Sequence, residues 1–303
     1  MPLTIRPIQP GDAEACGKIG YNAHKAISSA HGYPSEQPTE EHGIGLVKMI
    51  LGNPKNSWGV LAEREGRVLG SIFLHRFPPS PVAVIGPLTV TPAEEGGVGR
   101  ALMDAALDQA RIQGQDQVRL VQSPSHIRSF VLYTKCGFAL REPLFLVQGK
   151  PLALEHAKNN NSNNNDDNNN NAGSVRQVRD DGDDISACNE LCRIAHGFTR
   201  EGELRQAIGQ GAAIMIERNG QTTGYAAGIG LFGHAVAKSN KDLMGLISSA
   251  QTILGPGFFI PAQNHELMNW LFENNFRIAW PANLMTLGPY QQPDSAFLPS
   301  LAY

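Results

Sequence analysis

The stretch "TVTPAEEGGVGRALMDAALDQA", residues 89–110, decides the fold of the first half of the chain. It predicts a strand that runs into a glycine-rich loop, which opens at once into an amphipathic helix. Gly96, Gly97 and Gly99 let the backbone approach a ligand with no Cβ in the way. The start of the helix adds free N–H groups and the positive end of the helix dipole. The loop is therefore predicted to bind an anion.

The residues that follow the loop exclude two common phosphate-binding loops. A nucleoside-triphosphate P-loop requires Lys and then Ser or Thr after its last glycine, and here Arg100 and Ala101 follow Gly99. A dinucleotide-binding loop requires a third glycine where this chain has Leu102, and an acid at the end of the next strand. That strand, "QVRLVQ" (117–122), ends in no acid. Two interpretations remain: the pyrophosphate loop of an acetyl-CoA-dependent transferase, and glycines that only make a turn.

The rest of the first half has the pattern of a mixed α/β domain. Strand patterns occur before Pro10, in a hairpin over 57–77, and at 82–90, 117–122 and 139–147; helical spacing occurs at 12–32, 39–51, 98–114 and 126–138. Pro87 stands in the middle of 82–90, and proline removes a hydrogen bond from a strand ladder. We therefore expect the sheet to open or bulge at Pro87.

Two motifs, in this order and at this spacing, resemble the GNAT N-acetyltransferase superfamily. The family's loop, Gln/Arg-x-x-Gly-x-Gly/Ala, is matched by residues 94–99. Its later motif, Asn-x-x-Ala-x-x-Leu-Tyr-x-x-x-Gly-Phe, is matched by "HIRSFVLYTKCGF" (126–138). The resemblance covers about residues 3–150. The chain departs from the motifs at three positions: Glu94, His126 and Ser129 stand where the family has Gln or Arg, Asn, and Ala.

The resemblance implies that the chain binds acetyl-CoA as a co-substrate. Backbone N–H groups would hold its pyrophosphate, namely those of Glu95, Gly96, Gly97, Val98, Gly99, Arg100 and Ala101. The strand around Leu88 and Val90 would pair with the pantetheine arm, and His126, at the family's Asn position, would contact it. Because the loop works through its backbone, Glu94 in place of Gln or Arg should cost little.

The resemblance also implies that Tyr133 is the general acid, near the thioester sulfur. A phenol whose pKa stays near its usual ~10 is protonated at neutral pH and can give its proton to a leaving thiolate. The alternative is a core tyrosine on an amphipathic helix. The general base stays open, and the candidates are His75, Ser123, His126, Glu142 or a bound water.

An Asn-rich tract divides the chain. Residues 159–171 contain no apolar side chain, so burial cannot offset the entropy cost of ordering them. We expect a disordered linker over 156–173, between an N-acetyltransferase domain at 1–155 and a second domain at 174–303. An interaction tract is the alternative for the Asn-rich residues.

The second domain repeats the patterns of the first. "NHELMNWLFENNF" (264–276) aligns residue for residue with 126–138, which places Leu271 on Tyr133. No Gly-x-Gly lies between Phe232 and the helix expected in the middle of this domain. We interpret it as a degenerate GNAT-like domain that lacks the pyrophosphate loop and the acid, similar to the C-terminal halves of tandem GNAT proteins. Shared α/β patterning without a true repeat is the alternative.

Composition and charge exclude several classes of protein. A net charge of −3 with scattered Lys and Arg offers no basic surface for nucleic acid. No apolar run approaches the roughly 20 residues that span a membrane. The segment "MPLTIRPIQPGD" lacks the pattern of a signal peptide, and four cysteines do not make a disulfide scaffold. We expect a cytoplasmic protein that binds neither nucleic acid nor membrane.

One helix carries Cys188, Cys192 and His196 on a single face. Eight residues of helix rise about 12 Å, so the three side chains cannot bind one zinc ion at ~2 Å. We expect them to pack in the core, and we expect no metal site.

The leading functional prediction is an N-acetyltransferase, in which an amine attacks the thioester of acetyl-CoA directly. The acceptor would be a small-molecule or peptide amine. The alternative is a non-catalytic protein that binds acyl-CoA or a protein partner, with the degenerate half performing recognition.

Overall fold

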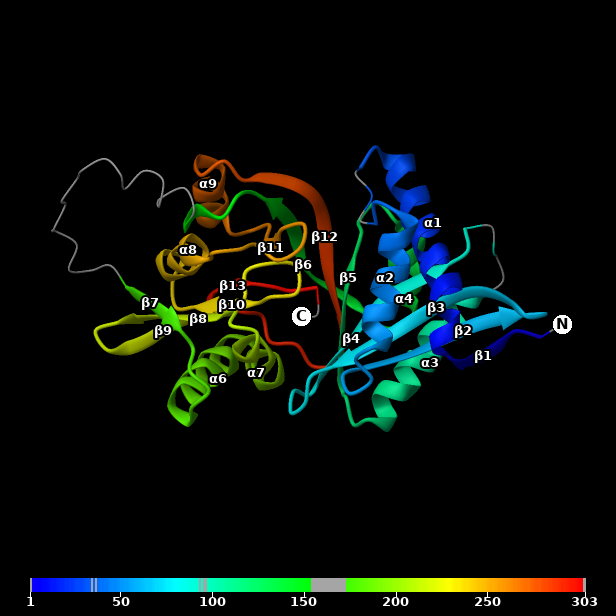
Figure 1. Ribbon diagram of the computed structural model, residues 1–303, viewed down its shortest axis with the longest axis horizontal. Coiled ribbons are helices and arrows are strands. Elements are labelled where there is room, and N and C mark those ends of the chain that lie inside the picture. Colours follow the sequence, from blue (N-terminus) through cyan, green and yellow to red (C-terminus); the bar gives the residue numbers. More distant parts are fainter. Residues whose placement is uncertain are drawn as a thin grey trace. The chain divides into compact units, whose positions relative to one another are not determined.

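The computed structural model describes residues 2–301, except 34, 36, 93, 95–96 and 154–172 (Figure 1). The chain forms two compact units, each assembled from several segments. The first unit comprises Met1–Arg76, Pro81–Leu140 and Leu284–Pro289; the second comprises Phe77–Ser80, Arg141–Asn283 and Tyr290–Tyr303. Both units are mixtures of helices and strands, so the predicted mixed α/β class is confirmed.

The first unit is built on a sheet with the strand order β1-β2-β3-β4-β5, followed by the end of β12. Its strands are β1 (Thr4–Pro7), β2 (Ser57–Arg64), β3 (Arg67–Arg76), β4 (Val82–Val90), β5 (Gln117–Gln122) and the last residues of β12 (Arg277–Leu287). Its helices are α1 (Ala13–His31), α2 (Glu40–Leu51), α3 (Val98–Ile112) and α4 (Ile127–Lys135). The strands from β1 to β4 pair antiparallel, and β5 runs parallel to β4.

Local sequence explains how these elements begin and end. The predicted hairpin turn lies at Glu65 and Gly66, which adopt φ values of 56° and 74°. Gly32 ends α1 in the left-handed conformation, at φ 70°. The apolar stripe of α3 packs with the inner face of the sheet in one core, which includes Leu69, Ile72, Val98, Leu102, Met103, Ala106, Leu120 and Tyr133.

The sheet opens along β4. Its pairing with β3 runs to Val90, with a register shift between Ile72 and Leu74. Its pairing with β5 covers only Val82–Val84. Within the described residues, no strand pairs with Ile85–Val90 on the β5 side. The expected interruption of the sheet near Pro87 is confirmed.

The second unit contains a sheet with the strand order β13-β10-β9-β8-β7. These strands are β7 (Ser174–Gln177), β8 (Ala213–Arg218), β9 (Gln221–Ala227), β10 (Ala235–Ala237) and β13 (Ala296–Leu298). The unit also holds most of β6 (Ala139–Gln148), which pairs antiparallel with β11 (Phe258–Pro261), and the first part of β12. Its helices are α6 (Gly182–His196), α7 (Glu201–Gly209), α8 (Asn240–Ser249) and α9 (His265–Glu273).

The two units exchange segments of chain. From Arg141 onward β6 belongs to the second unit, whereas Leu284–Pro289 belong to the first. The predicted linker at 156–173 lies outside the described residues, apart from Gly173. The expected boundaries at 1–155 and 174–303 stay a prediction about which segments fold on their own.

Candidate functional site

The open edge of β4 lies beside the start of α3 in the first unit. Thr91 donates its backbone N–H to the carbonyl of Leu69 in β3, at 2.8 Å. Backbone groups alternate between the two neighbours of a strand, so those of Leu88 and Val90 face the opposite, open edge. A Cβ placed on Gly99 would lie 3.8 Å from Val90 Cγ2, so the first turn of α3 lies against the end of this edge.

Among the described residues, no side chain caps the N-terminus of α3. Gly97 is its N-cap at φ 86°, and it makes no side-chain hydrogen bond to the first turn. No acidic residue lies in that turn. The N–H of Ala101 makes the first helical bond, to Gly97 O at 2.9 Å. The amides that precede this bond are those of Val98, Gly99 and Arg100, and they give the turn its positive end.

Two of the predicted pyrophosphate-binding residues, Glu95 and Gly96, lie outside the described residues. Leu88, Val90 and the segment from Gly97 to Ala101 are brought to one place by β4 and α3. The backbone N–H of Ala101 differs from the other N–H groups of that segment, because it already donates to Gly97 O within the helix.

Glu94 ties the glycine loop to the β2–β3 hairpin. Its side chain, only 12% exposed, forms ion pairs with Arg67 and with Arg64, the latter at 3.5 Å. Its backbone N–H donates to Thr91 O at 2.9 Å. Sequence reasoning treated Glu94 as a neutral replacement and missed this anchor. The only sequence signal for this anchor is the pair of arginines at 64 and 67. Their spacing does not indicate that they reach residue 94.

Tyr133 lies on α4 within the core of the first unit. Its side chain is 9% exposed, and its ring centroid lies 6.2 Å from that of Phe138. Burial raises the pKa of Tyr133, and the nearby Cys136 raises it further. The expectation of a pKa near the usual value is therefore wrong. Within the described residues the Tyr133 hydroxyl has no hydrogen-bond partner, so none of them engages its proton.

His126 is the N-cap residue of α4, but its imidazole does not cap the helix. Its carbonyl instead accepts hydrogen bonds from Ser129 Oγ at 2.8 Å and Gln122 Nε2 at 3.1 Å. Burial lowers the pKa of His126, and the positive charge of Arg128 lowers it further. The imidazole is thus held neutral near pH 7.

The candidate general bases differ in their hydrogen-bond partners and in the unit to which they belong. His75 Nε2 lies 2.6 Å from Gly86 O, and its Nδ1 lies 3.0 Å from Ser57 Oγ. Nε2 donates to the carbonyl, so Nδ1 accepts from the hydroxyl, and both nitrogens of the neutral imidazole are engaged by neighbouring groups of the protein. Ser123 Oγ lies 3.0 Å from the hydroxyl of a neighbouring serine. Glu142 belongs to the second unit, where burial raises the pKa of its carboxyl group.

The Cys188, Cys192 and His196 side chains are buried in the second unit. His196 packs edge-to-face on Phe297, with ring centroids 5.4 Å apart. Burial raises the pKa of both thiols, that of Cys188 to about 12. The expected core packing of these side chains is confirmed. Across the described part of the chain, no group of three or more His, Cys, Asp or Glu side chains could hold a metal ion.

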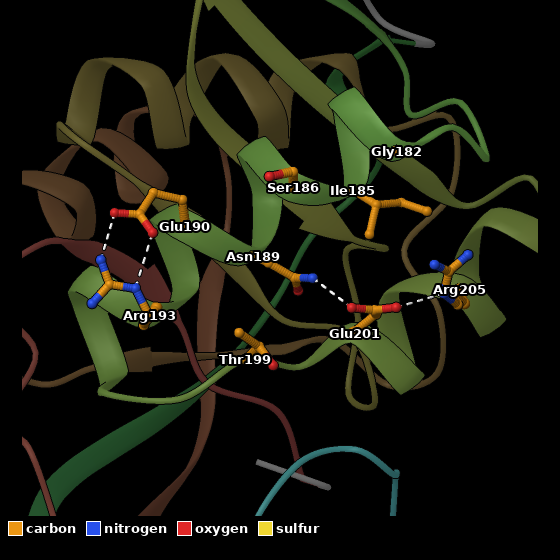
Figure 2. A pocket seen from close by; sticks show the side chains of 9 residues that line it. All are labelled: Gly182, Ile185, Ser186, Asn189, Glu190, Arg193, Thr199, Glu201 and Arg205. Atoms are coloured by element: carbon orange, nitrogen blue, oxygen red, sulfur yellow. Dashed lines mark hydrogen bonds and ion pairs between the residues drawn. The ribbon is translucent and has the colours of Figure 1, made fainter.

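Figure 2 shows a polar hollow of about 390 Å³ on the second unit. It is lined by Gly182, Ile185, Ser186, Asn189, Glu190, Arg193, Thr199, Glu201 and Arg205. Its charges are paired with one another, Glu190 with Arg193 and Glu201 with Arg205.

No helix among the described residues is both long and apolar enough to cross a membrane.

Comparison with known proteins identifies the first unit. Residues 24–138 match the model of the acetyltransferase (GNAT) family. Over 87 residues the chain is 37% identical to the mycothiol acetyltransferase of Beutenbergia cavernae. That match covers 28% of this chain and 29% of the relative, less than a third of either protein.

Two solved structures resemble the chain over nearly its whole length. A "Putative Acetyltransferase" from Pyrococcus horikoshii has a TM-score of 0.65 at 18% identity, over 99% of this chain and 95% of its own. A tandem GNAT protein from the clavulanic acid biosynthesis pathway has a TM-score of 0.51 at 15% identity, over 96% of this chain and 100% of its own. At such identities the likeness concerns the fold. The chain therefore carries an acetyltransferase domain of the GNAT family at residues 24–138, within a tandem GNAT fold.

Proposed function

We propose that this protein is an N-acetyltransferase that moves the acetyl group of acetyl-CoA to an amine. The observation that carries the proposal is the open edge of β4 beside the uncapped N-terminus of α3. An extended amide chain that ends in a pyrophosphate needs both features at one place. Enzymes of this family take their acetyl group from acetyl-CoA.

The proposed binding mode divides the cofactor between the two features. The pantetheine amides would pair with the backbone of Leu88 and Val90, whose N–H and C=O groups face the open edge. The pyrophosphate would accept hydrogen bonds from Gly97, Val98, Gly99 and Arg100, together with Glu95 and Gly96 from the same loop. Helix N-termini favour such anions, because free N–H groups and the helix dipole both point at them. The imidazole of His126 would contact the pantetheine arm as a neutral group.

In the proposed reaction the amine nitrogen attacks the thioester carbonyl and forms the new C–N bond. The C–S bond then breaks, and the departing thiolate takes the proton of the Tyr133 hydroxyl. The amine loses one proton to water or to a base. Burial that raises the pKa of Tyr133 keeps it protonated. Dry surroundings would also raise the pKa of the departing thiol, which makes the thiolate a stronger acceptor for the proton of the phenol.

The proposed acceptor is a small-molecule or peptide amine. A non-catalytic acyl-CoA-binding protein would need the β4 edge and the loop, but it would not need an uncommitted hydroxyl in the core. Release of free thiol from acetyl-CoA, measured against a panel of polyamines, amino acids and peptides, separates the two functions. Thiol release that stays at the rate without amine, for every amine tested, would contradict the enzyme.

Cofactor binding is tested on the full chain with Gly99→Glu. CoA should stabilise the wild-type protein by about 2.7 kcal/mol at a 100-fold excess over its Kd. A carboxylate at residue 99 places like charge where the pyrophosphate belongs, so the variant should lose both the thermal shift and the thiol release. Lys241→Glu is the matched control, since residue 241 lies two positions after the N-cap of α8, as residue 99 does in α3. An undiminished shift in Gly99→Glu would remove the loop from the site.

A further inference from the structure

The hairpin registers show which residues of the two units correspond. Gly70 in β3 and Gly224 in β9 each lie four residues after the glycine of a tight turn, which has φ 74° in one unit and 71° in the other. Gly70 pairs with Val90 of β4, and Gly224 pairs with Ala237 of β10. The last three residues of β4 therefore correspond to the three residues of β10.

The edge that is open in the first unit is occupied in the second. Lys238 donates its N–H to Thr223 O of β9 at 2.8 Å, so by strand alternation Ala235 and Ala237 point their backbone groups away from β9. Strand β13 lies along that edge and pairs antiparallel with β10, in the register Ala235↔Leu298, Val236↔Phe297 and Ala237↔Ala296. Ala235 takes the position of Leu88, and Ala237 takes the position of Val90. Leu88 and Val90 are the residues proposed to pair with pantetheine.

The chain holds β13 firmly in this position. Phe297 is 5% exposed and packs on the ring of His196. Ser300 Oγ accepts a hydrogen bond from Arg200 at 2.9 Å, and both residues are fully or almost fully buried. Leu301 donates its N–H to Leu231 O at 2.7 Å. The strand is thus an integral part of the second unit.

The start of α8 is also occupied. Six residues separate Val90 from Gly97, the N-cap of α3, but only Lys238 separates Ala237 from Ser239, the N-cap of α8. With the loop shortened, protein groups cover the helix terminus.

The covering groups form a closed network around one carboxylate. Ser239 Oγ accepts from Asp242 N–H at 3.2 Å and donates to Asp242 Oδ2 at 2.9 Å. The Asp242 residue is 3% exposed, and its carboxylate forms an ion pair with Arg218. The positive end of the helix dipole stabilises a carboxylate at the helix N-terminus, as it would stabilise a phosphate. In the first unit the corresponding Arg64 pairs instead with Glu94, in the glycine loop outside the helix.

We propose that the second unit is a GNAT-like fold whose cofactor site is filled by the chain itself. Strand β13 takes the position of the pantetheine arm, and the Asp242 carboxylate takes that of the pyrophosphate. The second unit then binds no acyl-CoA, and the protein binds one cofactor per chain. The inference rests on the proposed cofactor mode of the first unit.

Hydrogen–deuterium exchange of the full chain, with and without CoA, tests both ideas separately. We expect the amides of Ala235 and Ala237 to be protected without CoA and unchanged by it. The amides of Leu88 and Val90 should exchange rapidly without CoA and slowly with it. Rapid exchange at 235–237, or protection there that appears only with CoA, would overturn the filled site. Absence of any CoA effect at 88–90 would contradict the proposed function of the first unit, while protection at 235–237 would still support the filled site.

A pair of variants sharpens the exchange test. Phe297→Asp introduces a charge at a buried position of β13, and Ser295→Asp makes the same change just before the strand. We expect Phe297→Asp to lose exchange protection at 235–237 while β8 stays protected. Ser295→Asp should keep the protection at 235–237. Persistent protection of 235–237 after β13 has exchanged would show that another group covers the edge. Ser300→Ala, which removes only the Arg200 contact, is the milder variant, and it should raise exchange in β13 and β10 together.

Discussion

The two units keep the same structural ion-pair network and differ in the parts that would hold a cofactor. In the first, Arg6 of β1 binds Asp12 at 2.7 Å and Glu63 at 2.9 Å. In the second, Arg176 of β7 binds Asp184 and Glu217 in the same arrangement, at 2.5 and 2.6 Å. The network fastens a first strand to the following helix and to the hairpin in both units. The fold thus depends on features that both units retain, whereas the proposed cofactor binding depends on an edge and a helix terminus that only the first leaves open.

Helices α4 and α9 repeat this contrast on a smaller scale. Their N-cap residues, His126 and Asn264, have nearly the same backbone angles, with ψ values of 74° and 75°. Each N-cap is followed by a helix of nine residues, Ile127–Lys135 and His265–Glu273, as the alignment of the two segments predicts. Where α4 has Tyr133, α9 has the fully buried Leu271. Packing needs only an apolar side chain at this position. Packing alone therefore does not account for the hydroxyl of Tyr133.

The largest expected difference between the units concerns Tyr133. Tyr133→Phe keeps the ring and removes the proton donor, so kcat should fall by ~10²–10⁴-fold. The KM for acetyl-CoA should change little, because the proton is needed in the transition state. Steady-state thiol release measures both constants.

The control for Tyr133→Phe is Leu271→Met, a substitution of similar volume at the corresponding position of α9. It should leave kcat unchanged. A Tyr133→Phe enzyme that acetylates its best amine at the wild-type rate would return Tyr133 to a packing role.

The next effect concerns the ion-pair networks. Asp184 is 3% exposed and accepts hydrogen bonds from Arg176 and Arg179, which lower its pKa. Asp184→Asn should therefore lower the free energy of unfolding by about 3 kcal/mol. Asp12 is more exposed and has one arginine partner, so Asp12→Asn should cost about 1 kcal/mol.

Urea unfolding at several pH values measures these costs. Because the folded pKa of Asp184 lies below its unfolded value, its contribution is present above about pH 4 and is lost as the pH falls below that. The gap between wild type and Asp184→Asn should close over that range. Equal costs for the two substitutions would mean that the networks are equally buried in solution.

A smaller effect should appear in both units on acidification. Burial lowers the pKa of His75 in the first unit and of His234 in the second. Each imidazole must lose its proton to fold, so stability is complete above about pH 6.5 and falls as the pH drops below it. The loss approaches about 1.4 kcal/mol per pH unit for each histidine.

Unfolding free energies between pH 7 and pH 5 check this dependence. His75→Asn and His234→Asn should each reduce the slope by about one proton. Identical slopes in the wild type and the two variants would mean that His75 and His234 are protonated in the folded state.

The smallest expected effect concerns the anchor of the glycine loop. Glu94→Ala removes the ion pairs to Arg64 and Arg67, so CoA binding should weaken by about threefold, within the range of a partly exposed pair. Because salt screens such pairs, the ratio of Kd values should approach one near 1 M salt. Titration calorimetry at two salt concentrations measures it. Asp108→Ala, which removes an exposed pair with Arg111 on α3, is the control. A salt-independent ratio would mean that Glu94 acts other than through its charge.

Much of the fold could be predicted from local sequence pattern. The strand-loop-helix order at 89–110, the hairpin turn at Glu65 and Gly66, and the break near Pro87 all follow from residue chemistry within a few positions. The repeat of α4 in α9 could also be predicted from sequence, because the helical spacing is kept although the tyrosine is replaced by leucine. These features need no knowledge of what lies across the sheet.

Tertiary structure decided the rest. Segment exchange between the units, the Glu94 anchor, the engaged nitrogens of His75 and the raised pKa of Tyr133 each depend on groups far apart in sequence. The clearest case is β13, three residues near the end of the chain that pair with β10 some sixty residues earlier. Sequence showed that the second half lacks a glycine loop. Only the paired strands show that the edge corresponding to the open edge of β4 is closed, because a strand's free backbone groups carry no residue-specific signal of the partner that will satisfy them.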